Sequence, residues 1–538
     1  MAAPEPCDVL VIGAGAAGAI VTRVLAAAGI KVVCLEQGGW TRPDARPHAG
    51  EDWEWRRLTD YATDPNLRQA ADDYPVEGND EHTLMWNGVG GSTSIYTAIW
   101  PRLRPSDFRK GDEHGLAPNW PIAYEDLAPY YDRVDLMVGT SGLVGDPAMP
   151  PRGPFATPPL PLGAGGRHMA RAFDRLGWHW WPMPAAVLSR DYDGRPGCNH
   201  CGGCVSGCPR GALHDAAVSL WPQAIADGAR LVTGARVERI ETDAAGRATG
   251  AVYLDRASGE RRFQAADLVV LSANGVGTPR LLLLSESARF PHGLANGSDQ
   301  IGRNLMHHTL VSAELHVEPR VDGFQGFVAA LVSSQFAETD ASRGFVNGFN
   351  FNVARGSGPG MTAVGSFSRQ PAPWGAAHHA WFRRHFAHSI RVHAIGDDLP
   401  QAQNRVTLSA TLRDASGLPA PRVSYRPHAN DWRQMAFMRG PLRQLAEAAD
   451  AFDFTVNDYV DADGVYRTPA WHLLGTARMG DDPASSVIDR WHRSWEVPNL
   501  YIVDGSSMPT GGVANPTSTI SALALRAAEH IRDVAAHR

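Results

Sequence analysis

The alternation of apolar and polar segments near the N-terminus predicts two buried strands separated by a helix. Residues 8–12 (DVLVI) and 31–36 (KVVCLE) are short apolar runs, as expected for strands that are covered on both faces. Between them, the turn GAGAAG leads into the helix-like run AIVTRVLAAAG, which Gly29 closes. A strand, a glycine turn, a helix and a second strand in this order predict a βαβ unit with parallel strands.

The glycines of this turn have the spacing of a dinucleotide-binding fingerprint. Gly13, Gly15 and Gly18 match G-x-G-x-x-G. Gly13 permits the tight turn, Gly15 lets the backbone approach a pyrophosphate at the helix N-terminus, and Gly18 lets helix and strand pack closely. Glu36 ends the second strand, where a carboxylate can bind a ribose diol and disfavours a 2′-phosphate. The unit predicts FAD or NAD binding, with a ligand-free glycine turn as the alternative.

Later segments predict further strands of the same sheet and then a second, different sheet. Residues 230–240 and 267–272 are predicted strands of the nucleotide-binding sheet, and the Pro-rich residues 145–162 are expected to be ordered coil. Residues 311–456 have no glycine fingerprint and alternate more, which predicts a separate antiparallel sheet with helices. The last part of the chain has dense glycine turns and ends in an alanine-rich helix.

Length and charge narrow the class of protein. With 538 residues the chain is long enough for two domains, and its 43% hydrophobic content can fill large cores. A net charge of −7 argues against a nucleic-acid binder. The sequence has no run of about 18 apolar residues, so no membrane span is expected. The N-terminus lacks the pattern of a signal peptide, which favours a cytoplasmic location, with export beside a partner subunit as the alternative.

Several segments share their order and character with one enzyme family. They are GAGAAG at the N-terminus, NGVGGSTSIYTA (87–98), SANGVGTPRLLLLS (272–285), IGRNLMHH (301–308), NRVTLS (404–409), HLLGTARMG and VPNLYIVDGSSMPTGGVANPTSTISALALR. In these segments the chain resembles the glucose–methanol–choline (GMC) family of flavoenzymes. The resemblance implies an α/β, Rossmann-like FAD-binding domain and an α+β substrate domain with an antiparallel sheet. The FAD-binding domain is expected at 1–110, 195–310 and 465–538, and the substrate-binding domain with its connections at 111–194 and 311–464.

The resemblance also implies which residues contact FAD. Besides the N-terminal fingerprint, they are Gly90, Gly91, Ser92, Thr93, Val237, Asp504, Gly505, Asn515, Pro516 and Thr517. Some relatives attach FAD covalently through a histidine just after the GGST-like segment. Here that stretch is Ser94, Ile95 and Tyr96, so non-covalent FAD is expected.

The same resemblance implies the catalytic pair. In the family a histidine removes the hydroxyl proton while the flavin accepts hydride, and the matching residues are His472 and Asn515. Histidine suits the role of base because its ordinary pKa lies near working pH. The alternative for His472 is a structural histidine. His307 and His308 follow GRNLM, where relatives often have an acid before the histidine, and a structural, hydrogen-bonded role near FAD is expected for them.

Four cysteines form a run of their own. Cys198, Cys201, Cys204 and Cys208, followed by a proline, have the C-x2-C-x2-C-x3-C-P spacing of ferredoxins. An iron–sulfur cluster and reduced packing cysteines are the main alternatives, and zinc or a disulfide is less favoured because zinc usually draws on two separated pairs. Some sugar dehydrogenases of the family carry a cluster near the flavin and pass electrons to a cytochrome subunit, whereas other members have a similar stretch without metal. Cys7 and Cys34 are expected to be buried in strands.

The sequence therefore predicts FAD-dependent oxidation of a CH–OH group, with a sugar, glycoside or polyol as substrate. A dehydrogenase with a separate electron-acceptor protein is favoured. An oxidase of an apolar or aromatic alcohol that uses oxygen is one alternative. A flavoprotein subunit without catalytic function is the other.

Overall fold

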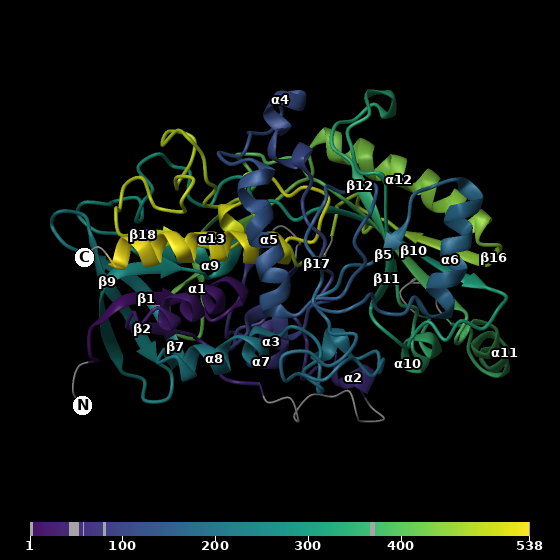
Figure 1. Cartoon of the computed structure of the whole chain (residues 1–538), viewed down its shortest axis with the longest axis horizontal. Coiled ribbons are helices and arrows are strands. Elements are labelled where there is room, and N and C mark those ends of the chain that lie inside the picture. Colours follow the sequence, from purple (N-terminus) through teal and green to yellow (C-terminus); the bar gives the residue numbers. More distant parts are fainter. Residues whose placement is uncertain are drawn as a thin grey trace.

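Two large sheets, each covered by helices, organise the computed structural model (Figure 1). The structure describes residues 4–41, 53–57, 59–78, 82–365, 372–467 and 469–536. In the view of Figure 1, the sheet that contains β1 (Cys7–Ile12), β2 (Val32–Leu35) and β9 (Arg261–Leu271) lies on the left and the second sheet on the right. Across the described residues, no helix is both long enough and apolar enough to cross a bilayer.

The first sheet has the predicted parallel βαβ unit at its centre. β1 pairs in parallel with β2 on one side and with β9 on the other. β6 (Arg230–Val232) and β18 (Leu500–Ile502) extend the parallel part beyond β2 and β9. The run from Val9 to Ile12 is buried, as a strand covered on both faces requires. The predicted strands 8–12 and 31–36 and the helix between them, α1 (Ala16–Ala27), are confirmed.

An antiparallel extension brings a further strand to the nucleotide end of the sheet. The predicted strand region 230–240 is two strands, β6 and β7 (Ala235–Thr242), because the chain turns at Gly234 with φ of +66°. β7 pairs with β8 (Ala248–Asp255), and β8 pairs with the first half of the long strand β9. The second half of β9 joins the parallel sheet, so one strand belongs to both arrangements.

Helices α1 and α9 (Asn274–Leu284) pack on the first sheet, and α13 (Thr517–Ala536) packs against α1 and α5 (Tyr124–Val138). α13, the predicted C-terminal helix, lies side by side with α1, as Figure 1 shows. α9 packs on β7. Cys7 and Cys34 are buried in β1 and β2, as predicted.

The second sheet is antiparallel, as predicted for residues 311–456. Its strand order is β16-β10-β13-β12-β11-β5. The strands are β5 (Trp181–Pro182), β10 (Thr309–Val317), β11 (Ala329–Phe336), β12 (Phe349–Ala354), β13 (Ser389–Gly396) and β16 (Ala451–Asn457). α12 (Ala429–Ala448) and α6 (Gly163–Leu176) cover the face that carries alternate apolar residues such as Val311 and Leu315. The opposite face of β10 carries Ser312, Glu314 and His316.

Short elements complete the described structure. Two small sheets are formed by β14 (Arg405–Arg413), β15 (Pro419–Ser424) and β3 (Glu77–Gly78), and by β17 (Pro469–Ala470) with β4 (His82–Thr83). The short helices are α2 (Trp53–Arg56), α3 (Pro65–Arg68), α4 (Lys110–His114), α7 (Ala216–Ser219), α8 (Trp221–Ala226), α10 (Pro359–Ala363) and α11 (Ala376–His385). Residues 145–162 are irregular, as expected, and Thr157 anchors them, because its backbone N–H donates to the carbonyl of Thr140 and its carbonyl accepts from the N–H of Gly142.

The sequence ranges of the two predicted domains remain a prediction. The strands of the first sheet come from residues 7–35, 230–271 and 500–502, and those of the second from residues 181–182 and 309–457. The two halves are therefore interleaved along the chain.

Candidate functional site

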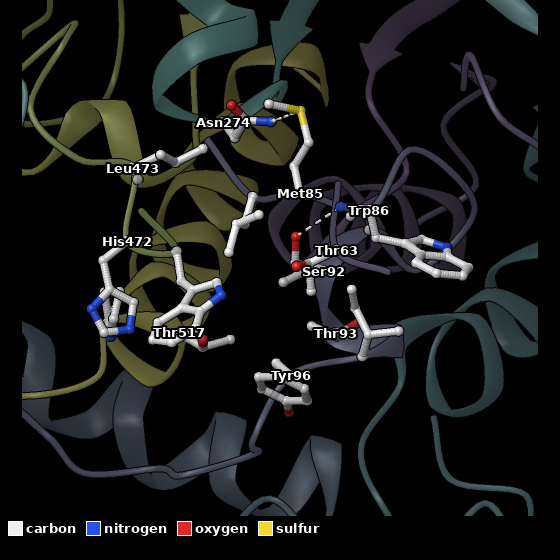
Figure 2. Close-up of a pocket in the computed structure, with 18 of the residues that line it drawn as sticks. Thr63, Met85, Trp86, Ser92, Thr93, Tyr96, Asn274, His472, Leu473 and Thr517 are labelled. Atoms are coloured by element: carbon white, nitrogen blue, oxygen red, sulfur yellow. Dashed lines mark hydrogen bonds between the residues drawn. The ribbon is translucent and has the colours of Figure 1, made fainter. Parts of the chain in front are cut away.

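A large cavity, lined by both halves of the protein, is the candidate site. Its volume is about 860 Å³. The walls come from the β1–α1 turn, β7, α9, the start of α13 and the polar face of the second sheet. Figure 2 shows side chains around this hollow, with His472 and Thr517 on one side and Trp86 on the other. Segments that are distant in the sequence thus meet in one cavity.

The predicted dinucleotide fingerprint forms part of the wall. Gly13 and Gly15 line the cavity, whereas Gly18 lies behind them on α1. A side chain at Gly18 would collide with the carbonyl oxygen of Gly13, so only glycine allows this packing. Within the described structure no side chain caps the first turn of α1, and its free N–H groups can bind a phosphate.

A second glycine loop closes against the first. Gly91 has φ of +54°, and a Cβ atom on it would lie 2.8 Å from Cα of Gly15. Ser92 and Thr93 line the cavity, and Gly90 lies behind them with φ of +94°. The two loops therefore meet through their backbones, and the N–H of Gly90 donates to the carbonyl oxygen of Ala14 at 2.9 Å.

Glu36 lies at the end of the cavity formed by the first sheet. Its carboxylate accepts hydrogen bonds from the backbone N–H groups of Ala14 and Gly38, both at 2.9 Å. Burial raises the pKa of Glu36, and these hydrogen bonds oppose the increase. Val237 of β7 also lines the cavity. The predicted ribose-binding and adenine-facing residues are thus neighbours in one wall.

The C-terminal motif supplies another wall. Asp504 accepts hydrogen bonds from Oγ1 of Thr278 at 2.6 Å and from the backbone N–H of Asn274 at 3.0 Å. Burial raises its pKa, which these bonds and others from Ser506 oppose. The other predicted residues of this region also line the cavity: Gly505, Asn515, Pro516 and Thr517.

A chain of hydrogen bonds fixes the tautomer of His472. Nε2 of His308 lies 2.8 Å from the carbonyl oxygen of Gly512, and Nδ1 of His308 lies 2.9 Å from Nδ1 of His472. Because a carbonyl only accepts, His308 must donate from Nε2, and Nδ1 of the neutral ring is then an acceptor. His472 therefore donates from Nδ1 and keeps a lone pair on Nε2. That nitrogen lies 3.4 Å from Nδ2 of Asn515.

The surroundings keep His472 unprotonated. Burial lowers its pKa well below the ordinary value of 6.5, and the neighbouring His308 and His307 lower it further. Burial also lowers the pKa of His308. The imidazole of His472 is therefore neutral near pH 7, as a general base must be.

His307 and His308 are held in place by one carboxylate. Asp398 accepts hydrogen bonds from the backbone N–H of each histidine, both at 2.9 Å, and from the hydroxyl of Tyr425 at 2.7 Å. Nδ1 of His307 lies 3.1 Å from the carbonyl oxygen of His472. Both histidines are hydrogen-bonded beside the cavity, as expected from the sequence, and the structure adds that both contact the residue predicted to be the base.

The polar face of the second sheet was missed by the sequence analysis. Ser312 and Glu314 of β10, His393 and Arg391 of β13, and Asn352 of β12 line the cavity. Oγ of Ser312 lies 2.7 Å from Nδ1 of His393, and Glu314 is opposite Arg391 in the strand register. The alternation of TLVSAELHV was the available signal, because polar residues at every second position predict a polar face. What that face meets could not be read from the sequence.

The cysteine run, residues 198–208, forms a loop beside the cavity. Cys201 is exposed, the other three cysteines are partly buried, and Val205 lines the cavity. Burial raises the pKa of Cys204 to about 12; Arg355 opposes this, and the other three thiols add to it. In the described parts of the chain, no three of these sulfur atoms lie within 4.8 Å of one another. A single zinc ion needs its thiolates closer than that, so zinc is disfavoured.

Comparisons with known proteins agree with the fold and the motifs. Two models described as GMC oxidoreductase match residues 7–310 and 400–524. The chain is 48% identical to a 2-methyl-1,2-propanediol dehydrogenase of Mycolicibacterium austroafricanum, over 98% of this chain and 95% of the relative. It is 32% identical to the fructose dehydrogenase large subunit of Gluconobacter japonicus, over 97% of each chain. It is also 32% identical to a paromamine 6'-oxidase of Streptomyces fradiae, over 97% of this chain and 91% of the relative.

Solved structures show the same fold at low sequence identity. A formate oxidase of Aspergillus oryzae, studied for modification of its FAD, superposes with a TM-score of 0.68 at 17% identity and covers 99% of both chains. This structural similarity shows the fold alone, whereas the family models and the relatives above 30% identity also show the family. The chain is an enzyme of the GMC oxidoreductase family and a flavoprotein, as the sequence predicted.

Proposed function

We propose that the protein is an FAD-dependent dehydrogenase that oxidises a CH–OH group of a small diol or other polyol, with His472 as the base. The observation that carries the proposal is the unprotonated Nε2 of His472. It lies beside the amide of Asn515, in the cavity that the dinucleotide fingerprint also lines. A base with this tautomer and this location suits removal of a hydroxyl proton.

The chain's own residues would prepare the substrate. Nε2 of His472 takes the hydroxyl proton, and the Nδ1–H bond to His308 holds the ring in this orientation. Asn515 cannot titrate, and its Nδ2–H group would donate to the substrate oxygen and orient it. When bound, FAD supplies the hydride acceptor.

The cavity wall suits FAD as predicted from the sequence. The first turn of α1, with Gly13 and Gly15, would bind the pyrophosphate, and Glu36 would bind the adenosine ribose. The remaining contacts would come from Gly90, Gly91, Ser92, Thr93, Val237, Asp504, Gly505, Asn515, Pro516 and Thr517. We propose non-covalent attachment, because no histidine stands at Ser94, Ile95 or Tyr96.

The polar face of the second sheet supports a hydroxylated substrate. Ser312, Glu314, Arg391 and His393 offer donors and acceptors on the cavity side. A second hydroxyl could pair with them, and a site with buried polar groups discriminates against a substrate that lacks one. The 48% identity to a diol dehydrogenase supports the same substrate class. The second candidate is an oxidase of an apolar or aromatic alcohol, in which the electrons pass to oxygen. A relative at 32% identity that is named as an oxidase supports the use of oxygen.

The surroundings of the cysteine run support an iron–sulfur cluster as a second cofactor. Arg355 is buried and Arg195 is partly buried, and in the described structure the buried Nη1 atom of each has no hydrogen-bond partner. A Cβ atom on Gly202 would lie 2.6 Å from Nη1 of Arg355, so this group lies against the run. Buried cations need a counter-charge, and four thiolates around a cluster would supply it. Because Val205 and Arg355 line the cavity, such a cluster could take electrons onward to a partner protein.

Replacing the base should slow the chemical step and spare the cofactor. In His472→Ala, the rate of flavin reduction by 2-methyl-1,2-propanediol should fall by roughly 10²–10⁴, the usual effect of a lost general base. Anaerobic stopped-flow absorbance measures it. The control His379→Ala changes an exposed histidine and should reduce at the native rate. Native kinetics in His472→Ala would contradict the assignment.

The pH dependence should reflect the lowered pKa of His472. The unprotonated ring is active, so kcat/KM should stay level through neutral pH and fall only below the ordinary value of 6.5. His308→Gln removes one group that lowers this pKa, so the acid limb should move to higher pH. A native acid limb centred above 6.5 would show that a different group is the base.

A side chain at the contact between the two glycine loops should weaken FAD binding. In Gly91→Ala, the new Cβ atom would meet Cα of Gly15, and the residue would be strained at its positive φ, so FAD should bind at least roughly tenfold more weakly. Flavin released by acid precipitation, counted per chain, measures the effect. Gly440→Ala, in an open position on α12, should keep native FAD. If the flavin of the native protein stays in the pellet after acid precipitation, the proposal of non-covalent attachment is wrong.

Metal analysis tests the cysteine run. Protein purified without oxygen should contain roughly three to four irons per FAD, with acid-labile sulfide and an electron paramagnetic resonance signal. Cys201→Ser should lose or alter that signal, whereas Cys7→Ala, outside the run, should not. Full FAD without iron would leave the four residues as packing cysteines, and the dehydrogenase proposal would then stand on His472 alone.

A further inference from the structure

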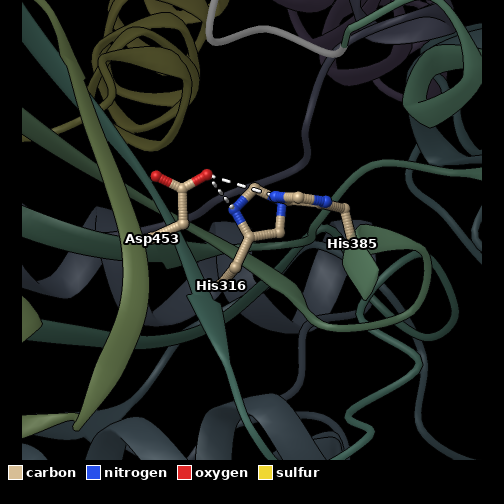
Figure 3. A group of neighbouring side chains, drawn as sticks. All are labelled: His316, His385 and Asp453. Atoms are coloured by element: carbon tan, nitrogen blue, oxygen red, sulfur yellow. Dashed lines mark hydrogen bonds and ion pairs between the residues drawn. The ribbon is translucent and has the colours of Figure 1, made fainter. Parts of the chain in front are cut away.

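A second cluster of ligating side chains lies on the same polar face of the second sheet, away from the cavity. It consists of His316, His385 and Asp453 (Figure 3). One potential ligand atom from each residue lies within 4.8 Å of the others, and no other such group of three occurs among the described residues. Ser312 and Glu314 line the cavity, but His316, next in the same row of β10, does not. The cluster is therefore separate from the proposed catalytic site.

The three side chains converge on one carboxylate oxygen. Oδ2 of Asp453 lies 3.3 Å from Nε2 of His385 and 3.9 Å from Nδ1 of His316. The two rings are nearly perpendicular, at 80°, with centroids 4.7 Å apart. His316 and Asp453 are register partners in β10 and β16, and His385 is the last residue of α11. Three separate elements thus present their nitrogen and oxygen atoms to one point.

A backbone carbonyl determines which nitrogen of His385 faces the carboxylate with a lone pair. Nδ1 of His385 lies 2.8 Å from the carbonyl oxygen of Trp381, so Nδ1 is the donor. In the neutral ring, Nε2 is then an acceptor, and it faces another acceptor, the carboxylate of Asp453. Two acceptors at 3.3 Å repel each other unless a cation lies between them. That cation is either a second ring proton or a metal ion.

We propose that His316, His385 and Asp453 bind a divalent transition-metal ion of the zinc class. Two imidazoles and one carboxylate suit zinc better than calcium or magnesium, which prefer oxygen ligands alone. The Trp381 carbonyl would orient the His385 ligand in the way that outer hydrogen bonds usually orient metal-bound histidines. The Asp453 side chain is 34% exposed, so an ion can enter from solvent and keep a water molecule as its fourth ligand.

The bound metal ion would stabilise the edge of the second sheet. β16 is the edge strand and pairs with β10 alone among the strands of this sheet. A bound ion would tie the end of α11 to both strands. The same two strands carry Ser312, Glu314 and Asn457, which line the cavity. The bound ion would therefore stabilise one wall of the proposed active site from outside the cavity.

Zinc titration of the metal-stripped flavoprotein tests the proposal. Native protein should take up about one zinc ion at this site, measured by elemental analysis after gel filtration, and its melting temperature should rise by a few degrees. His385→Ala and Asp453→Asn should lose this zinc and the increase in melting temperature. His379→Ala, on the exposed side of the same helix, should keep both.

Two further measurements make the result decisive. Cys201→Ser should keep the zinc, because the cysteine run is a different site; zinc lost from Cys201→Ser but kept by His385→Ala would overturn the proposal. The absence of uptake by native protein at micromolar zinc would also overturn it and leave a His385–Asp453 ion pair only. FAD content reports folding of each variant, and Asp453→Asn, which keeps the shape of the side chain, serves if His385→Ala does not fold.

Discussion

The hydrogen bond from His308 to the carbonyl oxygen of Gly512 determines what the candidate site can do. Because that carbonyl cannot donate, it fixes the proton of His308 on Nε2, and this in turn fixes the proton of His472 on Nδ1. The lone pair of His472 then faces Asn515 and the cavity. The carbonyl belongs to the same C-terminal segment as Asn515, so one loop sets both the tautomer of the proposed base and the position of its partner. If the loop moved, both would change together.

The fold explains how these groups meet. The first sheet brings the β1–α1 turn, Glu36 and Asp504 to one side of the cavity, and the second sheet presents its polar face on the other. Asp398 holds the backbone of His307 and His308 just before β10 begins, so the histidine that orients the base is fixed to the start of a strand of the second sheet. The proposed base and its orienting histidine therefore come from segments far apart in the sequence, and the fold as a whole defines their distance.

The sequence allowed the parallel βαβ unit with Gly13 and Gly15 and the antiparallel sheet to be predicted, because these features depend on local patterns, whereas Gly91 and Gly505 were expected from the family resemblance. Gly91 shows the limit of sequence-based prediction. The glycine itself is seen in the sequence, but its contact with Gly15 exists only in the folded chain. The same holds for His308. Its position after GRNLM suggested a structural histidine, and only the structure shows that it shares a hydrogen bond with His472. Ser312, Glu314 and Arg391 were missed because alternation predicts a polar face without predicting what it faces.

The positive charges on the second-sheet side of the cavity affect which substrates it can bind. Arg57, Arg355 and Arg391 all line it, and burial lowers the pKa of Arg391 to about 10, with Glu314 opposing and the other two guanidinium groups adding to the decrease. Mutual repulsion among these three cations, of which Arg355 is buried and Arg57 and Arg391 are partly buried, is a cost that a protonated amine on the substrate would increase. A neutral hydroxylated molecule avoids that cost and can still accept hydrogen bonds from guanidinium groups. The electrostatics of this wall therefore favour a diol or polyol over an amino sugar, although relatives of similar overall sequence identity include enzymes named for both kinds of substrate.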